Sequence, residues 1–85
     1  MGNKKTLEKI LRGSKNIRFN EMVTLIHSFG FKEARVSGSH HIFTRKDIDE
    51  IINIQNVRGK TKPYQAKQFI KVIEKYNLEM IEGEK

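Results

Sequence analysis

The amino-acid sequence predicts an α+β domain with the element order helix, helix, strand, strand, strand, helix. Three short runs rich in Val, Ile, Phe and Thr are flanked by stretches in which apolar residues recur at helical spacing. Short connections separate these runs, as an antiparallel meander requires. We therefore expect an αβββα arrangement, with helices packed on a three-stranded antiparallel sheet and an extra short helix at the N-terminus.

The extra helix is predicted over residues 6–12, and Gly13 with Ser14 supplies its stop. Its apolar residues are Leu7, Ile10 and Leu11. A helix this short is marginal in water by itself, so it must dock on the domain or on a partner. We expect residues 1–16 to form an appendage of the main domain.

The main domain is predicted over residues 17–78. Its first helix begins after Asn20, a favourable N-cap, and ends at Gly30 in the C′ position. The strands follow over residues 31–37, 40–45 and 51–55. Gly38 and Ser39 separate the first two strands, and residues 46–50 are polar enough to join the second and third as an exposed loop.

The last helix is predicted to carry Pro63 in its first turn and to end with Asn77 as its C-cap. One apolar stripe on this helix comprises Ala66, Phe69, Ile70 and Ile73. Residues 79–85 hold three glutamates and are expected to be a frayed acidic tail.

The composition limits the class of protein. The 85 residues include 17 Lys and Arg against 10 Asp and Glu, a net charge of +7 that attracts anionic polymers and surfaces. Charge alone leaves nucleic acid, membrane surfaces and acidic proteins open as partners. The absence of cysteine excludes disulfides and cysteine-based metal sites. Without a membrane-length apolar run or a signal core, the protein is expected to be cytoplasmic and to have no membrane partner.

Two adjacent histidines, His40 and His41, stand at the start of the second predicted strand, directly after Gly38 and Ser39. Strand alternation sends their side chains to opposite faces, so at most one of them packs against the helices. Histidine suits RNA cleavage because its imidazole exchanges protons near neutral pH without a metal. The alternative is a strand histidine that only packs or binds a carbonyl. His27, on the polar side of a helix, is expected to be structural.

A basic cluster precedes the last helix, where free backbone N–H groups and the helix dipole favour phosphate. Its members are Arg58, Lys60 and Lys62. Lys67, Lys71 and Lys75 continue it at a spacing of four residues, which predicts a basic stripe along the helix. The alternative for the helical lysines is an ordinary solvated face.

Other kinds of site lack support in the sequence. There is no Walker loop, dinucleotide fingerprint or zinc-ligand spacing, and no cofactor is predicted. Asp47, Asp49 and Glu50 lack the spacing of a calcium loop. A serine triad is also disfavoured, because Ser39 and its neighbour His40 point to opposite faces of the strand.

Three motifs together make the chain resemble HicA-type toxins. They are Gly-Ser-His-His-Ile-Phe from Gly38, Ile-Ile-Asn-Ile-Gln-Asn from Ile51, and Gly-Lys-Thr-Lys-Pro-Tyr-Gln-Ala-Lys-Gln from Gly59. The likeness covers about residues 17–78. It implies a small RNA endonuclease of a toxin–antitoxin pair, with a double-stranded-RNA-binding-domain-like fold and inhibition by a HicB-type antitoxin.

The resemblance also implies roles for single residues. His40 takes the position of the family's essential histidine, with His41 as the alternative. Lys60, Lys62 and Lys67 resemble the basic patch that enters the last helix of double-stranded-RNA-binding domains. The predicted RNA-binding residues are Ser39, His41, Arg58, Lys60, Lys62, Lys67 and Lys71. The helix over residues 6–12 is an addition to the minimal αβββα pattern.

The leading hypothesis is a metal-independent endoribonuclease that cleaves mRNA, with His40 as general acid or base and the basic cluster stabilising charge on the phosphate. A second hypothesis is an RNA-binding module that cuts nothing, and a third is a domain that binds an acidic protein. An RNA cleavage assay with chelator separates the three.

Overall fold

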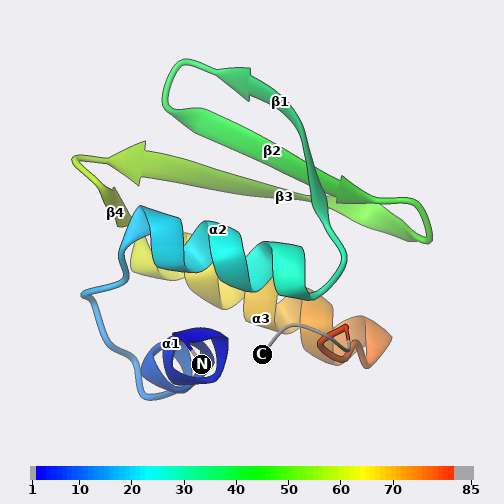
Figure 1. The fold of residues 1–85 in the computed structure, drawn as a ribbon, viewed down its shortest axis with the longest axis horizontal. Helices are drawn as coiled ribbons and strands as arrows, with labels where there is room; N and C mark the ends of the chain where they lie inside the picture. The colour runs from blue at the N-terminus through cyan, green and yellow to red at the C-terminus, as the bar shows by residue number, and fades with distance from the viewer. Residues whose placement is uncertain (1, 82–85) are drawn as a thin grey trace.

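The structure is a computed structural model that describes residues 2–81 (Figure 1). Its elements are α1 (Gly2–Leu11), α2 (Phe19–Ser28), β1 (Lys32–Ser37), β2 (His40–Arg45), β3 (Ile48–Val57), β4 (Lys60–Thr61) and α3 (Pro63–Tyr76). The strands form one antiparallel sheet in the order β1-β2-β3-β4. The predicted α+β fold is confirmed, with β4 as a short strand added to the meander.

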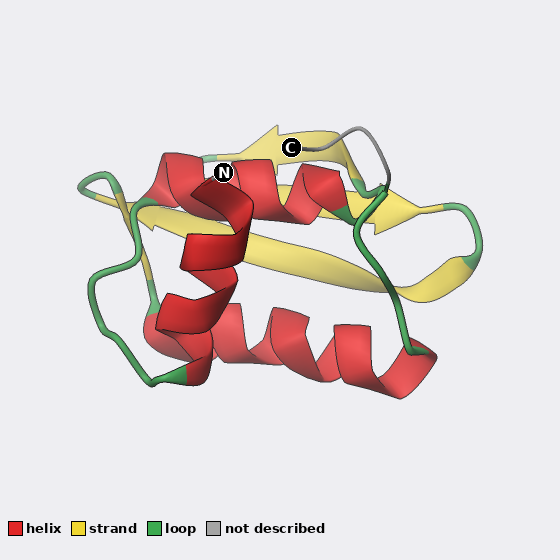
Figure 2. Cartoon of the chain, turned by 60° about the horizontal axis from the view of Figure 1, so that its bottom comes forward, coloured by secondary structure: helices red, strands yellow, loops and turns green. Residues whose placement is uncertain are grey.

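The elements form three layers. Helices α2 and α3 cover one face of the sheet, and α1 crosses both of them on the side away from the sheet (Figure 2). Phe31, Phe43 and Phe69 are among the largest fully buried side chains between sheet and helices. No helix of residues 2–81 lies over the opposite face of the sheet (Figure 1). We call this the open face, and the covered one the helix face.

Helix α1 begins at Gly2, four residues before the predicted start. Its first turns bury the polar residues Asn3 and Thr6 instead of apolar ones, which a search for apolar spacing does not detect. Ile10 is 3% exposed and belongs to the core, and Lys9 Nζ lies 3.0 Å from Glu21 Oε1 on α2. Helix α1 is thus packed into the domain that it precedes.

Helix α2 begins at Phe19, and the predicted N-cap Asn20 is wrong. Arg18 is the N-cap, with extended backbone, and its N–H donates to Glu21 Oε1 at 3.2 Å. In a capping box, the side chain of the third helical residue accepts a hydrogen bond from the N-cap N–H, and Glu21 does this here. Glu21 thus helps to cap the helix although the Arg18 side chain has no acceptor oxygen. The end of the helix is as predicted, because Gly30 has φ +91° directly after the C-cap Phe29.

The prediction of an exposed loop over residues 46–50 is wrong. β3 begins at Ile48, which is 7% exposed and pairs with Arg45 after a register shift in β2. The bulge lets the strand pair earlier than its composition suggested. Asp49 and Glu50, taken as loop residues, therefore lie on a strand and leave only a tight turn between β2 and β3.

Helix α3 has Pro63 in its first turn and Asn77 as a left-handed C-cap with φ 53°, both as predicted. Ala66, Phe69 and Ile70 are buried, while Ile73 packs on the core less completely. After the helix, the Ile81 N–H donates to the Ser28 carbonyl at 2.7 Å. The rest of the predicted acidic tail, including Glu82 and Glu84, lies outside the described residues.

Candidate active site

The register of the sheet separates the two neighbouring histidines. His40 pairs with Gln55 across β2 and β3, and His41 pairs with Ile54. Ile54 is fully buried beneath the helices, so His41 shares the helix face and His40 the open face. Two side chains on opposite faces of one strand cannot both reach a single phosphate. The structure therefore offers two separate environments instead of a histidine pair.

His40 is held by one neighbour on the open face. Its Nδ1 lies 3.2 Å from Asn53 Oδ1, and since an amide oxygen only accepts, Nδ1 is the donor. In a neutral imidazole the other nitrogen, Nε2, is then the unprotonated one. Nε2 is consequently able to accept a proton from a hydroxyl group placed over the open face.

His41 is held by two neighbours on the helix face. Its Nδ1 lies 2.5 Å from Glu33 Oε2 on β1, and its ring centre lies 4.6 Å from that of Phe19 on α2. Phe19 itself is only 7% exposed. Ring packing on Phe19 and the contact with the Glu33 carboxylate hold the His41 side chain, which is 22% exposed, in place on the helix face.

The turns next to His40 meet at one end of the sheet. Asn56 connects them, because its N–H donates to the Ser39 carbonyl at 2.8 Å and its Oδ1 accepts from the Gly59 N–H at 2.7 Å. Arg58, in the turn between β3 and β4, has a left-handed backbone with φ 54°. The predicted residues Ser39, His40 and Arg58 are thus brought to the same end of the molecule.

A cavity of about 420 Å³ lies at this end, beside β4 and the first turn of α3. Its lining residues are Lys15, Val57, Arg58, Lys60, Thr61, Lys62 and Pro63. Val57 lies on the same face of β3 as Gln55, the partner of His40, and it pairs with Lys60. Two residues of the cavity wall, Val57 and Lys60, therefore lie on the open face that carries His40.

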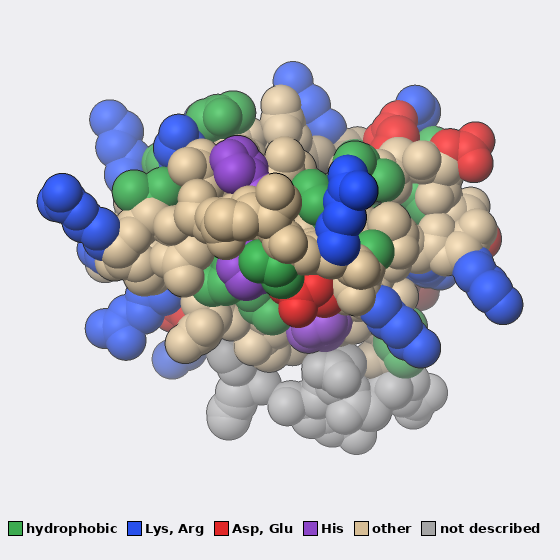
Figure 3. Space-filling model, turned by 90° about the horizontal axis from the view of Figure 1, so that it is seen from above, with side chains coloured by type: hydrophobic (Ala, Val, Ile, Leu, Met, Phe, Trp, Pro, Cys, Tyr) green, Lys and Arg blue, Asp and Glu red, His purple; other side chains and the backbone are tan. Residues whose placement is uncertain are grey.

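The charges on the open face are unevenly distributed. Figure 3 shows basic side chains at both ends of this face, and those at its left end lie where the turn between β3 and β4 is in Figure 1. Acidic side chains appear at its right end, toward the turn between β2 and β3. A polyanion is attracted most strongly to the basic end, beside His40.

The predicted basic stripe is divided in the structure. Arg58, Lys60 and Lys62 line the cavity near His40, whereas Lys67 and Lys71 flank a groove between α1 and α3. That groove lies in the helical layers, away from the open face (Figure 2). The three residues of the turn and cap are therefore better placed than the two helical lysines to bind a substrate at His40.

Two residues of this end were missed in the sequence. Asn53 lies thirteen residues from His40, and a single polar residue among isoleucines is a signal only when the strand register is known. Lys15 lies in the linker after α1 and reaches the cavity because residues 16–18 pair alongside β4. No local pattern in the sequence points to either role.

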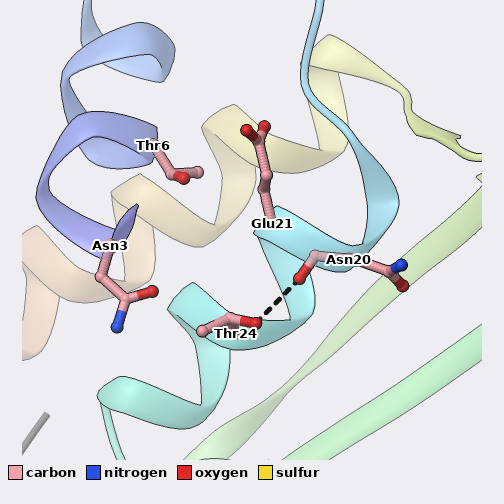
Figure 4. A pocket seen from close by; sticks show the side chains of 5 residues that line it. All are labelled: Asn3, Thr6, Asn20, Glu21 and Thr24. Carbon is pink, nitrogen blue, oxygen red and sulfur yellow. Dashed lines mark hydrogen bonds between the residues drawn. The ribbon is translucent and has the colours of Figure 1, made fainter. Parts of the chain in front are cut away.

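A second hollow, between α1 and α2, is a poorer candidate (Figure 4). Its lining residues are Asn3, Thr6, Asn20, Glu21 and Thr24, none of them basic. Burial raises the pKa of Glu21, but the hydrogen bonds from Lys9 and from the Arg18 N–H outweigh this and lower the pKa overall. An ionised carboxylate at its wall disfavours phosphate.

Residues 2–81 hold neither a membrane-spanning helix nor a cluster of metal-binding side chains. No helix in this part of the chain has the length and apolar character to cross a membrane. No group of three histidine, aspartate or glutamate side chains in it is arranged to hold a metal ion.

His27 contacts a carbonyl, with Nδ1 2.9 Å from the Phe31 oxygen, which agrees with the structural role expected for it.

Comparison with known protein families matches residues 19–76 to the HicA toxin of bacterial toxin–antitoxin systems. The match includes His40 and His41, the cluster Arg58, Lys60 and Lys62, and all of α3. It leaves out α1 and the linker with Lys15 and Arg18. No curated protein and no solved structure gives a significant match to the chain.

Proposed function

Because the chain belongs to the family of HicA toxins of bacterial toxin–antitoxin systems, we propose that it is a metal-independent endoribonuclease that cleaves mRNA and thereby inhibits translation and growth. One observation carries the choice of catalytic residue. His40 stands on the open face with Nδ1 engaged by Asn53 and Nε2 without a partner among residues 2–81, at the end of the sheet where the basic cavity lies. We assign the RNA-cleaving unit to residues 17–78.

In the proposed reaction, His40 Nε2 takes the proton of a ribose 2′-hydroxyl. The 2′-oxygen attacks the adjacent phosphorus, and the bond from phosphorus to the 5′-oxygen of the next nucleotide breaks. Arg58 and Lys60 stabilise the negative charge that develops on the phosphate oxygens. His41 lies on the other face, so the proton for the leaving oxygen comes from His40 in its protonated form or from water.

An RNA cleavage assay in the presence of a chelator tests this function. We expect the purified protein to cut RNA with EDTA present, and the folded His40→Ala variant to bind RNA without cutting it. Binding without cleavage by the wild type would support a non-catalytic RNA-binding module. Absence of both would leave an acidic protein as the partner and would contradict the proposal.

The second partner that we propose is a HicB-type antitoxin. A surface that attracts RNA phosphates also attracts an acidic protein, so we expect the antitoxin to cover His40 and part of the basic surface from Arg58 to Lys71. Excess antitoxin should then displace RNA in a competition assay. Simultaneous binding of RNA and antitoxin would contradict this arrangement. Since mRNA is the substrate, we assign the protein to the cytoplasm.

Helix α1 adds one apolar side chain to this predicted interface. Leu11 is 62% exposed beside the groove that Lys67 and Lys71 flank, while Ile10 is buried in the core. We expect Leu11→Ser to weaken antitoxin binding and to leave RNA cleavage unchanged. Removing residues 1–16 is a harsher test, because the loss of Ile10 opens the core. Unchanged antitoxin binding by both variants would exclude α1 from the interface.

A further inference from the structure

We infer that the cavity beside β4 binds one phosphate group of the RNA, and that Lys15 and Thr61 are binding residues of this subsite. The inference rests on the proposed function, because it assumes RNA as the substrate. Lys15 precedes the part of the chain that the HicA family match covers, so the subsite is partly built by the N-terminal extension.

The charge of the cavity favours a phosphate. Four of its lining residues are cations, namely Lys15, Arg58, Lys60 and Lys62, and none of its lining residues is acidic. Within residues 2–81, none of the four forms an ion pair with a carboxylate. Lys60 Nζ donates to Asn16 Oδ1, a neutral group, so its charge is positioned without being neutralised. Such a cluster attracts an oxyanion strongly.

Thr61 provides a second and independent observation. It lines the cavity and is 2% exposed, and its hydroxyl oxygen has no hydrogen-bond partner among the described residues. A buried hydroxyl without a partner destabilises a fold. A phosphate oxygen bound in the cavity would give this hydroxyl an acceptor once the side chain turns toward it, and would remove this cost in stability.

The cavity is organised before any ligand arrives. The Thr61 N–H donates to the Ile17 carbonyl at 2.8 Å, and the Phe19 N–H donates to the Gly59 carbonyl at 2.8 Å. These two bonds fasten the linker after α1 to the turn between β3 and β4, and they bring Lys15 to the mouth of the cavity. A preorganised site binds its ligand without the entropic cost of ordering the loop.

The position of the cavity relates it to catalysis. Val57 in its wall lies two residues beyond Gln55, the partner of His40, which is roughly 7 Å along the strand. Both residues lie on the open face. A single RNA strand that places one phosphate at His40 is therefore able to place a neighbouring one in the cavity.

The first test compares Lys15→Ala with Lys5→Ala, an exposed lysine of α1 outside the cavity. Both variants lose one charge. We expect Lys15→Ala to reduce the slope of log Kd against log salt for single-stranded RNA by about 0.7, the value of one lost phosphate contact, and Lys5→Ala to leave it unchanged. Equal effects of the two substitutions would show that only net charge matters and would overturn the inference.

The second test uses the hydroxyl. Thr61→Val removes the unpartnered polar atom and keeps the shape, so we expect a higher melting temperature together with RNA binding weakened by roughly fivefold. Thr61→Ser keeps the hydroxyl and should bind RNA with the affinity of the wild type. A more stable Thr61→Val variant with unchanged affinity would remove Thr61 from the subsite, as would a Thr61→Ser variant that binds no better.

Two RNAs of one sequence, with and without a 5′-phosphate, distinguish the source of the phosphate. We expect Lys15→Ala to weaken the binding of both, as an internal phosphodiester requires, whereas an effect confined to the phosphorylated RNA assigns the cavity to a terminal phosphate. Failure of the inference is separable from failure of the proposed function. If the wild-type protein cleaves RNA and Lys15→Ala behaves like Lys5→Ala, only the subsite is refuted and the proposed function stands.

Discussion

His40 and His41 are neighbours in the chain but belong to different parts of the molecule. His40 stands on the open face beside a basic cavity and contacts Asn53, a neutral amide. His41 lies under α2, between the carboxylate of Glu33 and the ring of Phe19. The difference shows how one residue type is presented to solvent on one face of a strand and packed against a helix on the other, because the alternation of a strand gives adjacent residues opposite surroundings.

The largest expected effect is that of His40→Ala. Loss of a general acid or base should lower the rate of RNA cleavage by about 10²- to 10⁴-fold, while RNA affinity changes only a few-fold. Cleavage of a labelled RNA and a binding titration on the same preparation measure the two effects. If a folded His41→Ala variant loses cleavage while His40→Ala retains it, the catalytic role belongs to His41 on the helix face and not to His40.

Asn53→Ala tests whether the contact of His40 on the open face orients its ring. We expect kcat to fall by roughly ten- to hundredfold, with the Kd for RNA unchanged, because a misplaced imidazole still permits binding. Asn53→Asp keeps an acceptor oxygen at the same place and should recover part of the rate. Equal losses in kcat and in RNA affinity would assign Asn53 to substrate binding instead.

The basic end of the open face is tested by the double variant Lys60→Ala and Lys62→Ala. Loss of two phosphate contacts should lower the slope of log Kd against log salt by about 1.4 for single-stranded RNA. Lys32→Ala with Lys46→Ala is the matched control, since both residues are exposed and lie toward the other end of the sheet. A salt slope that stays at the wild-type value would exclude the two lysines from the site.

His41→Ala should affect stability more than activity. Removing the ring that packs on Phe19 should lower the free energy of unfolding by about 1 kcal/mol, and cleavage should stay within a few-fold of the wild type. Urea denaturation measures the first quantity and initial cleavage rates the second. His40→Ala is the control, since its own effect on the unfolding free energy should be smaller.

The smallest effect is expected at Glu21, whose carboxylate pairs with Lys9 on α1. Its folded-state pKa lies below the ordinary value of 4.5, so its contribution to stability is present above pH 4.5 and is lost as the pH falls through the folded pKa. The partly exposed pair with Lys9 should contribute less than about 1 kcal/mol. Melting temperatures from pH 7 to pH 3 should therefore fall less steeply for Glu21→Gln than for the wild type. Parallel curves would contradict the role of this pair.

The sequence by itself determined the α+β class, the order of the elements, and the ends of α2 and α3 at Gly30 and Asn77. These features are local, since periodicity, turn residues and caps act within a few positions of each other. The same local reasoning identified two candidate histidines and a basic turn. It misplaced the start of β3 because a bulge in β2 depends on pairing between strands.

Only the tertiary structure decided which histidine faces the open side, since that depends on the register between strands and on the side that the helices cover. It also decided that Asn53 supports His40, and that Lys15 joins Lys62 across almost fifty residues of chain. Such contacts arise when distant segments bury a common core, and no spacing along the chain encodes them. The predicted residues became a site because packing brought one end of the sheet, one linker and one helix terminus together.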